Sequence, residues 1–512
     1  MLSSFCRVLF LSTIFTTTAL SQQVSRLVVL YRAPQVPAIA DIALAEAGAR
    51  THRHLGRLGA SVFTVDEANE PWAVFRLSLQ PEVLAVVHDR IVTGHAMTVS
   101  AAKATPHSTQ DVTSLPVKVI SANPPHQLAW MPAPVTDATY NSPAGWAVQA
   151  AGGYGDNVPG GNPVGPWNTT KGAGMRIAIL DSGVDANHPD LVSNLALNMT
   201  EVDKTALPSA CDDGSPQDQT GHGTWAASLA AGALGGGETV GVAPQATLLN
   251  IKVLERMPAA AGSTATAQCE AGQTGGLLSW VLAGINDALA QRADVISLSL
   301  GTIVDLTTGD GAGWKASFDR VTYAAQQAGV VIVAAAGNDG LDLSGGRYIE
   351  LPAQARGVLA VVASTNPACV EDLSPTAICV KGPVTRPYYS NYGATLNAIA
   401  APGGSYPEGP DNAVSGWIRG ACSTGVTNTQ DGLPSVGKSF GCFNLGHAQY
   451  VQAMGTSASA PLVAGAAALV KAAHPNWTAT QIVNALQATA TPSVSMQQSA
   501  INLPAALAFT PQ

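Results

Sequence analysis

The chain holds an aspartate, a histidine, an asparagine and a serine at positions that could support acyl transfer. Asp181 directly follows an apolar run, His222 lies between two glycines, and Asn338 follows a second apolar run. Ser457 stands just before a run of Ala, Val, Leu and Gly at 462–473, which suits a helix buried on all sides. Taken alone, each residue also has a plain structural reading. Asp181 and Asn338 could form turns, His222 could be a buried histidine, and Ser457 could cap a helix.

Taken together, the four residues supply the parts of a serine nucleophile site. A serine hydroxyl is a poor nucleophile at neutral pH, and His222 could act as the base that it needs. The base needs an acceptor that fixes its tautomer and stabilises the imidazolium, a role open to Asp181. The Asn338 amide and the Ser457 backbone N–H could donate to the oxyanion, because unpaired N–H groups point out of a helix N-terminus.

The elements that must position this site alternate between apolar strands and helices. Strands are predicted at 175–180, 246–254, 295–300, 329–336, 357–363 and 396–400. Helices are predicted at 222–231, 277–291, 317–328 and from Ser457 onward. Continuous apolar strands separated by helices indicate an α/β/α sandwich around a mostly parallel sheet, with ligands at the carboxyl ends of the strands. The helix after Ser457 is expected to be too short and too rich in small residues to span a membrane.

The chain before residue 171 divides into three segments. Residues 1–21 read as a secretory signal, with Arg7 as the only early charge and a short apolar run broken by Ser and Thr. A membrane anchor is the alternative. Residues 22–104 form a unit of their own, and residues 105–170 are a linker or an irregular arm of the mature chain, rich in Pro, Gly, Asn and Thr. We expect a secreted, extracellular protein with no membrane contact after signal cleavage.

The unit at 22–104 has the pattern of a small α+β fold. Strands are predicted at 26–31, 61–65, 73–79 and 91–99, and helices at 41–58 and 80–88. The resulting β-α-β-β-α-β order is compatible with a ferredoxin-like plait.

Composition narrows the class of function. Apolar residues make up 46% of the 512 residues and charged residues 12%, with 51 Gly and 33 Pro, so we expect a compact, loop-rich protein. The net charge of −9 argues against nucleic acid as a partner. Asparagines in Asn-X-Thr sequons are glycosylation acceptors if the host is eukaryotic: Asn168, Asn198 and Asn476.

Cysteine use points to disulfides. Loss of the signal removes Cys6 and leaves an even number of cysteines in an exported chain. The connectivity stays open on sequence alone. Short loops favour Cys369–Cys379 and Cys422–Cys442, which leaves Cys211–Cys269.

Three segments closely resemble the active-site signatures of subtilisin-like serine proteases, in that family's order. They are Asp-Ser-Gly-Val-Asp at 181–185, Gly-His-Gly-Thr at 221–224 and Gly-Thr-Ser at 455–457. The run that ends at Asn338 looks like the family's oxyanion strand. The resemblance implies a subtilisin-like catalytic domain at 171–512 and a serine endopeptidase that needs no cofactor for catalysis. Asp181 would orient His222, His222 would act as base and acid, Ser457 as nucleophile and Asn338 as oxyanion donor.

The resemblance also implies which segments bind the substrate. Residues 297–301 are similar to the strand that pairs with the substrate backbone and walls the primary pocket. The implied substrate-binding residues are Ser299, Leu300 and Gly301 on this wall, Ala335, Ala336 and Gly337 on the opposite wall, and Gly275 and Gly276 on the facing edge strand. A peptide would pair between two strands.

The unit at 22–104 resembles the inhibitory propeptide of the same family. This implies a self-processed zymogen whose partners are protein or peptide substrates and its own propeptide, acting as a monomer. The cleavage point is left open between about 103 and 145. A permanent accessory domain is the alternative.

The sequence also departs from the family pattern. Ala458-Ser459 stands where many members have Met-Ala, a form that also resembles the sedolisins, which are acid peptidases. Sedolisins carry a Glu in place of the histidine and an Asp at the oxyanion position, so His222 and Asn338 favour the subtilisin assignment. A catalytically inactive secreted binding protein on the same fold is the other alternative. The segment at 404–450 is longer than expected, which leaves the substrate range open.

A structural calcium ion is not supported at the loop 233–240. This loop offers only Glu238 as a charged oxygen ligand, whereas calcium takes several. Calcium elsewhere is left open, and no metal ligands are predicted.

Overall fold

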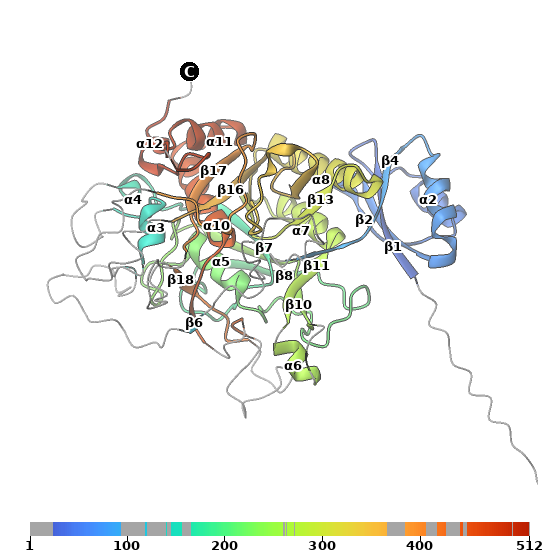
Figure 1. Ribbon diagram of the computed structural model, residues 1–512, viewed down its shortest axis with the longest axis horizontal. Coiled ribbons are helices and arrows are strands. Elements are labelled where there is room, and N and C mark those ends of the chain that lie inside the picture. Colours follow the sequence, from blue (N-terminus) through green and yellow to red (C-terminus); the bar gives the residue numbers. More distant parts are fainter. Residues whose placement is uncertain are drawn as a thin grey trace, which may run out of the picture.

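The computed structural model describes residues 24–93, 118–119, 140, 145–155, 165–259, 262, 264–270, 272–365, 384–405, 417–425, 441–443, 448–493 and 495–510. These residues form a small N-terminal unit and a large α/β domain. The N-terminal unit, drawn in blue, lies against one end of the large domain (Figure 1).

A seven-stranded sheet with the order β17-β16-β14-β12-β7-β9-β8 forms the centre of the large domain, and its neighbouring strands are parallel. Its strands are β7 (Arg176–Asp181), β8 (Leu195–Thr200), β9 (Thr247–Lys252), β12 (Val295–Leu298), β14 (Val331–Ala335), β16 (Val358–Ser364) and β17 (Ala398–Pro402). The sequence predicted every strand but β8. This edge strand is half-exposed along its length, so it lacks the continuous apolar run that marks the others.

Helices cover both faces of this sheet. α5 (His222–Ala231), α10 (Thr456–Ala473) and α11 (Ala479–Ala488) pack on one face, and α7 (Leu278–Ala290) and α8 (Gly309–Gln327) pack on the other. Strand β7 divides its side chains accordingly. Ile177 and Ile179 join the first core, whereas Ala178 and Leu180 join the second. The predicted α/β/α sandwich is confirmed.

Helix α8 begins well before the predicted start at 317. The glycines at 309, 311 and 313 are poor helix formers, but the side chain of Thr308 accepts a hydrogen bond from Gly311 N at 3.0 Å and caps the first turn.

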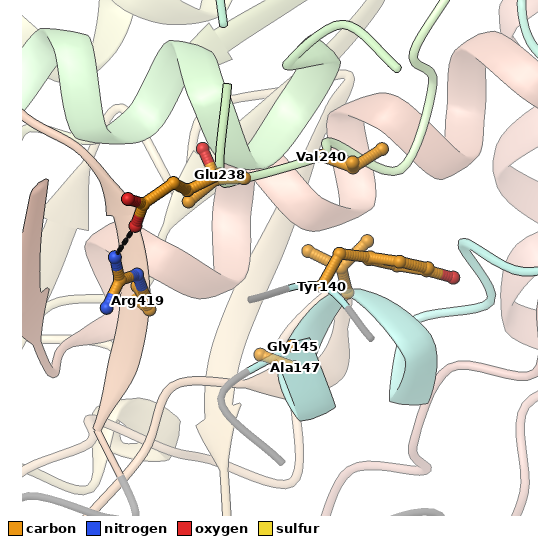
Figure 2. Close-up of a pocket in the computed structure, with 8 residues that line it drawn as sticks. Tyr140, Gly145, Ala147, Glu238, Val240 and Arg419 are labelled. Atoms are coloured by element: carbon orange, nitrogen blue, oxygen red, sulfur yellow. Dashed lines mark hydrogen bonds and ion pairs between the residues drawn. The ribbon is translucent and has the colours of Figure 1, made fainter. Parts of the chain in front are cut away.

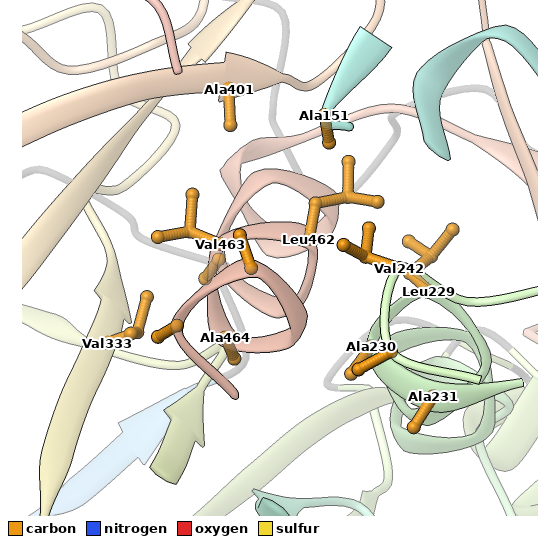
Figure 3. Packing of buried hydrophobic residues seen from close by; sticks show 14 of the residues in the cluster. Ala151, Leu229, Ala230, Ala231, Val242, Val333, Ala401, Leu462, Val463 and Ala464 are labelled. Atoms are coloured by element: carbon orange, nitrogen blue, oxygen red, sulfur yellow. The ribbon is translucent and has the colours of Figure 1, made fainter. Parts of the chain in front are cut away.

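Helix α10 runs through the first core, where Leu462, Val463 and Ala464 pack among small side chains of α5 and the sheet (Figure 3). By length and composition it could cross a membrane, contrary to the expectation from sequence. However, 83% of the stretch is buried inside the molecule, as in the core helix of a globular protein. A Cβ on Gly465 would lie 2.7 Å from Ala230 O, so α10 approaches α5 closely at this glycine.

The N-terminal unit is a four-stranded antiparallel sheet with the order β2-β3-β1-β4. Its elements are β1 (Val24–Tyr31), α1 (Ala40–Glu46), β2 (Arg50–Leu55), η1 (Gly56–Leu58), β3 (Ala60–Asp66), η2 (Glu67–Asn69), α2 (Glu70–Ser78) and β4 (Val83–His88). The predicted β-α-β-β-α-β order and ferredoxin-like plait are confirmed.

Several predicted elements inside this unit are wrong. The helix expected at 41–58 ends at Glu46, because the exposed, polar residues that follow form strand β2. The strand expected at 73–79 belongs to α2, which has Pro71 in its first turn. The helix expected at 80–88 is strand β4, whose valines favour a sheet.

Smaller sheets join distant segments. β5 (Ile91–Thr93), the described part of the strand expected at 91–99, pairs with β11 (Gln273–Leu277), which also pairs with β10 (Glu255–Met257). β13 (Thr302–Asp305) pairs with β15 (Tyr348–Leu351), and β19 (Tyr450–Ala453) lies between β18 (Ile418–Ala421) and β6 (Lys118–Val119). The remaining short helices are α3 (Trp146–Ala150), α4 (Pro166–Thr169), α6 (Ala265–Glu270), η5 (Leu343–Gly345) and α12 (Leu503–Leu507).

Two of the predicted disulfides are present, Cys211–Cys269 and Cys422–Cys442. Cys369 and Cys379 lie outside the described residues.

From the predicted linker, Trp146 and Trp167 are buried in the first core of the large domain.

Candidate active site

Asp181 and His222 form a buried pair at the carboxyl edge of the sheet. Asp181 is the last residue of β7, and His222 is the first residue of α5. His222 Nδ1 lies 2.7 Å from Asp181 Oδ1. Burial disfavours the imidazolium, but the charge of Asp181 and its hydrogen bond outweigh this effect, so the pKa of His222 is raised. Asp181 therefore holds the ring in one orientation and stabilises its protonated form.

Asp218 fixes the loop that leads into α5. Its buried carboxylate accepts hydrogen bonds from the backbone N–H groups of Thr220, Gly221 and Thr224, and from the hydroxyl of Ser182 just after β7. These bonds tie the first turn of α5 to the end of β7. Asp218 is not among the residues predicted from the sequence, although a signal exists, since Asp is favoured where the N–H groups of a helix start are unpaired.

The glycines on either side of His222 permit close approach of the backbone. A Cβ on Gly223 would lie 2.1 Å from Gly183 O and 3.1 Å from Asp181 Cβ. Gly221 has a φ of +89°, and a Cβ there would lie 2.6 Å from Cys422 Sγ. A side chain at either position would push His222 away from Asp181.

Ser457 is the second residue of α10 and is 4% exposed. In a regular helix its carbonyl would accept from the N–H of residue 461, but that residue is proline. The hydroxyl of Ser299, just after β12, donates to this carbonyl instead, at 3.0 Å. A residue of the predicted substrate wall therefore holds the backbone of Ser457. Ser459 donates to Pro402 O at 3.0 Å and has a structural contact only.

The side chain of Asn338 is oriented by Thr456. Asn338 Oδ1 accepts hydrogen bonds from Thr456 N and Thr456 Oγ1, both at 2.9 Å. A Cβ on Gly455 would lie 3.3 Å from Asn338 Nδ2 and 3.7 Å from Ser457 N. The two donors predicted for the oxyanion thus border the same small space beside Gly455.

The Ser457 hydroxyl and the His222 imidazole are not hydrogen-bonded to each other in the described part of the chain. Their helices, α10 and α5, pack against each other in the first core. Hydrogen bonds between a nucleophile and its base are often long without substrate and tighten when it binds. The arrangement is therefore compatible with transfer of the Ser457 proton to His222.

The segments predicted to pair with substrate enclose strand β5. Gly275 and Gly276 of β11 pair antiparallel with Thr93 and Val92. From the other side, Gly301 N donates to Thr93 O at 3.2 Å. The tail of the N-terminal unit thus lies between the two strand edges, as an extended peptide would.

The opposite predicted wall continues from β14. Ala335 and Ala336 are fully buried, and Gly337 N donates to Thr456 Oγ1 at 3.2 Å. Leu300, on the first wall, is also fully buried and joins the second core. The structure therefore gathers the predicted residues of both walls around the start of α10.

A model of the subtilase family matches residues 172–503. The chain belongs to the subtilase family. Members of this family are subtilisin-type serine endopeptidases that need no cofactor for catalysis.

Curated subtilases match over part of the chain. Subtilisin NAT of Bacillus subtilis subsp. natto is 30% identical over 320 residues, which cover 62% of this chain and 61% of that protein. Thermitase of Thermoactinomyces vulgaris is 36% identical over 175 residues, which cover 34% of this chain and 51% of thermitase. The match therefore spans about three fifths of the length of subtilisin NAT.

Solved structures of related proteases share the fold. Fervidolysin from Fervidobacterium pennivorans, a keratinolytic enzyme related to subtilisin, has a TM-score of 0.59 at 19% identity, covering 96% of this chain and 61% of that chain. The epidermin leader peptide processing serine protease from Staphylococcus aureus has a TM-score of 0.58 at 17% identity, covering 95% and 98%. At these identities the likeness shows the fold alone.

The one acidic side chain in the loop 233–240 of this subtilase is engaged by an arginine. Arg419, buried on β18, forms an ion pair with Glu238 beside a small pocket that Tyr140 and Val240 also line (Figure 2). Glu238 thus faces a guanidinium group. Within the described residues, no group of three or more His, Cys, Asp or Glu side chains is arranged to hold a metal ion.

Proposed function

We propose that the protein is a secreted serine endopeptidase that hydrolyses peptide bonds in proteins through a Ser/His/Asp triad and an acyl-enzyme. The observation that carries this proposal is the buried 2.7 Å contact between Asp181 and His222 at the carboxyl edge of the sheet. Ser457 and Asn338 stand at the same edge, on α10 and just after β14.

The reaction follows from these positions. Ser457 Oγ attacks the substrate carbonyl while His222 Nε2 takes its proton, because Nδ1 is held by Asp181. Asn338 Nδ2 and Ser457 N donate to the oxyanion. His222 then gives the proton to the leaving amine, which leaves an acyl group on Ser457. A water molecule repeats the sequence, with His222 again as base, and releases the acid.

The pH dependence separates this function from that of an acid peptidase. His222 works as a base only when neutral, and its pKa is raised by Asp181 against the effect of burial. Activity should therefore fall as the pH drops through this raised pKa. A sedolisin-type enzyme would instead work best in acid. The histidine at 222 and the amide at 338 favour the subtilisin mechanism.

The N-terminal unit would act as an inhibitory propeptide. Val28, Leu30 and Val87 of its sheet share the second core with α7 and α8, and β5 fills the space between the two substrate-binding edges. A substrate could not enter while β5 is there. We propose self-cleavage between about residues 103 and 145, and release of a mature monomer after signal removal near residue 21.

The test uses Ser457→Ala, with Ser459→Ala as the matched control on the same helix turn. The purified full-length wild type should cleave itself, hydrolyse peptides and be labelled at Ser457 by a serine-directed phosphonylating reagent. Ser457→Ala should fold with an unchanged melting temperature but lose cleavage and labelling, whereas Ser459→Ala should keep both. Full peptidase activity in Ser457→Ala would refute the function. N-terminal sequencing of the wild-type product tests the signal and propeptide boundaries.

A further inference from the structure

A buried carboxylate lies between the two predicted walls of the substrate site. Glu350 belongs to β15 and is 1% exposed. A Cβ placed on Gly301 would lie 2.0 Å from Glu350 Oε1, and a Cβ placed on Gly337 would lie 3.0 Å from Glu350 Oε2. Gly301 belongs to the wall after β12, and Gly337 to the wall after β14. The carboxylate therefore lies against the backbone of both walls at their glycines, and Asn391 Nδ2 lies beside it, 2.3 Å from the Cβ position of Gly337.

This carboxylate lacks the partners that other buried acids have. Glu350 Oε2 forms no hydrogen bond, and no Lys or Arg among the residues that the structure describes pairs with it. In contrast, Asp212 pairs with Lys252 at 2.8 Å and Glu255 pairs with Lys204 at 3.1 Å. A buried carboxylate that is ionised and unpaired is unfavourable. Glu350 is therefore either protonated and neutral, or it is paired with a cation that comes from outside the chain.

The position of a bound substrate places its side chain near Glu350. A peptide that pairs as β5 does has one residue opposite Gly301. Because the two partners of an antiparallel pair run in opposite directions, the residue two positions further along the peptide lies opposite Ser299. Ser299 contacts the carbonyl of Ser457. That second residue is therefore beside the nucleophile and between the walls, on the amino side of the bond to be cleaved.

We propose that Glu350 selects Lys or Arg at the residue on the amino side of the cleaved bond, an inference that rests on the proposed endopeptidase function. The basic side chain would enter between the two walls and pair with the carboxylate in a water-poor site. Because residue 301 is a glycine, Glu350 Oε1 occupies the place that a side chain on this wall would take and faces the space between the walls. A charge-assisted hydrogen bond to Lys or Arg would satisfy Glu350 Oε2.

The charge state of Glu350 adds a second, independent signature. Burial raises the pKa of Glu350 well above its usual range, and the nearby Asp339 raises it further. A bound cation favours the ionised form. The preference for a basic over an apolar residue should therefore increase as the pH rises through the pKa of Glu350, and it should vanish where the carboxyl stays protonated.

The experiment measures kcat/KM for peptides that differ only at the residue before the cleaved bond, which is Lys, Arg, Leu, Phe or Glu. The mature wild-type enzyme should cleave the Lys or Arg peptide about 100-fold better than the Leu peptide. Glu350→Gln should lose this preference and its pH dependence. Asp305→Asn is the matched control, since its carboxylate lies on the partner strand β13 and pairs with Arg347 on the surface; it should behave as wild type.

The outcomes are separable. An enzyme that prefers Leu or Phe, or a Glu350→Gln variant that keeps the basic preference, would overturn the role of Glu350 and leave the endopeptidase function standing. No cleavage of any peptide by wild-type enzyme, with no labelling of Ser457, would refute the endopeptidase function itself. Gln matches Glu in shape, so Glu350→Gln should fold. If it does not, the wild-type peptide panel and its pH dependence still decide the question.

Discussion

His222 and His88 both lie against carboxylates, and they are held in opposite ways. The His222 side chain is 10% exposed and has one carboxylate partner, Asp181. The His88 side chain is 43% exposed and lies between two carboxylates, with Nε2 2.7 Å from Glu70 and Nδ1 3.0 Å from Asp310. Glu70 belongs to the N-terminal unit, whereas Asp310 belongs to α8 of the large domain. One histidine is fixed inside a domain, and the other bridges two units.

The covalent surroundings differ as well. The Cys422–Cys442 disulfide lies against the loop before His222, where Phe443 N donates to Thr220 O at 2.5 Å and the Phe443 ring is 6.3 Å from the His222 ring. His88 is held to the large domain by an ion pair with Asp310, without a covalent link nearby among the described residues. Burial and a covalent brace suit a group that must keep its geometry through catalysis. Exposed ion pairs suit an interface that has to separate.

The largest effect on catalysis is expected when the buried Asp181–His222 pair is broken. Asp181→Asn keeps the shape of the side chain but removes the charge that orients and stabilises the His222 imidazolium. Self-cleavage of the full-length protein should slow by about 10⁴-fold with little change in melting temperature. The rate is measured from the accumulation of the cleaved chain over days. Near wild-type cleavage would mean that Asp181 does not act on His222 as proposed.

A smaller effect is expected from loss of the disulfide brace. Replacing both Cys422 and Cys442 by Ser should lower the free energy of unfolding by about 2–4 kcal/mol, since the link closes a loop in the unfolded chain. Activity at low temperature should persist, because Asp218 and Asp181 still hold the loop and the ring. Chemical denaturation with and without the double change measures the difference. Equal stability would show that the loop does not need the link.

The positions of the four candidate catalytic residues could be predicted from the sequence. Asp181, His222, Asn338 and Ser457 stand where apolar runs end or begin, and a parallel sheet brings such positions to one edge. Strand β2 and helix α2 were predicted wrongly because their residues are largely exposed. Such segments lack the periodic pattern of apolar residues that marks a buried strand or helix. Tertiary contacts decide their conformation.

Polar contacts between residues far apart in the chain could not be predicted from local sequence patterns. The bond from Ser299 to the carbonyl of Ser457 depends on Pro461 and on strand β12, which are far apart in the chain. Glu350 reads as an ordinary acidic residue in an apolar strand until the fold places it between Gly301 and Gly337. Such groups can be recognised only when the structure shows which of them lack a partner.

The smallest effect concerns the bridging histidine. Burial opposes protonation of His88, but Asp310 and Glu70 outweigh this, so its pKa is raised above the usual 6.5. The charged bridge is complete below that usual value and is lost as the pH rises through the raised pKa. The N-terminal unit should thus bind the large domain more tightly in acid and more weakly in base. Because His88 is partly exposed, the difference should stay below about fivefold.

The measurement is the dissociation constant of the cleaved N-terminal unit from the mature enzyme, obtained by direct binding, which does not depend on activity, at about pH 5.5 and about pH 8.5. His88→Gln should weaken binding at the lower pH and remove most of the pH dependence. His54→Gln is the matched control, because His54 contacts Asp41 and Ser61 inside the N-terminal unit and does not bridge the two units. If both variants keep the pH dependence of wild type, the bridge does not control release, and the buried contacts of Val28, Leu30 and Val87 with the second core set the affinity alone.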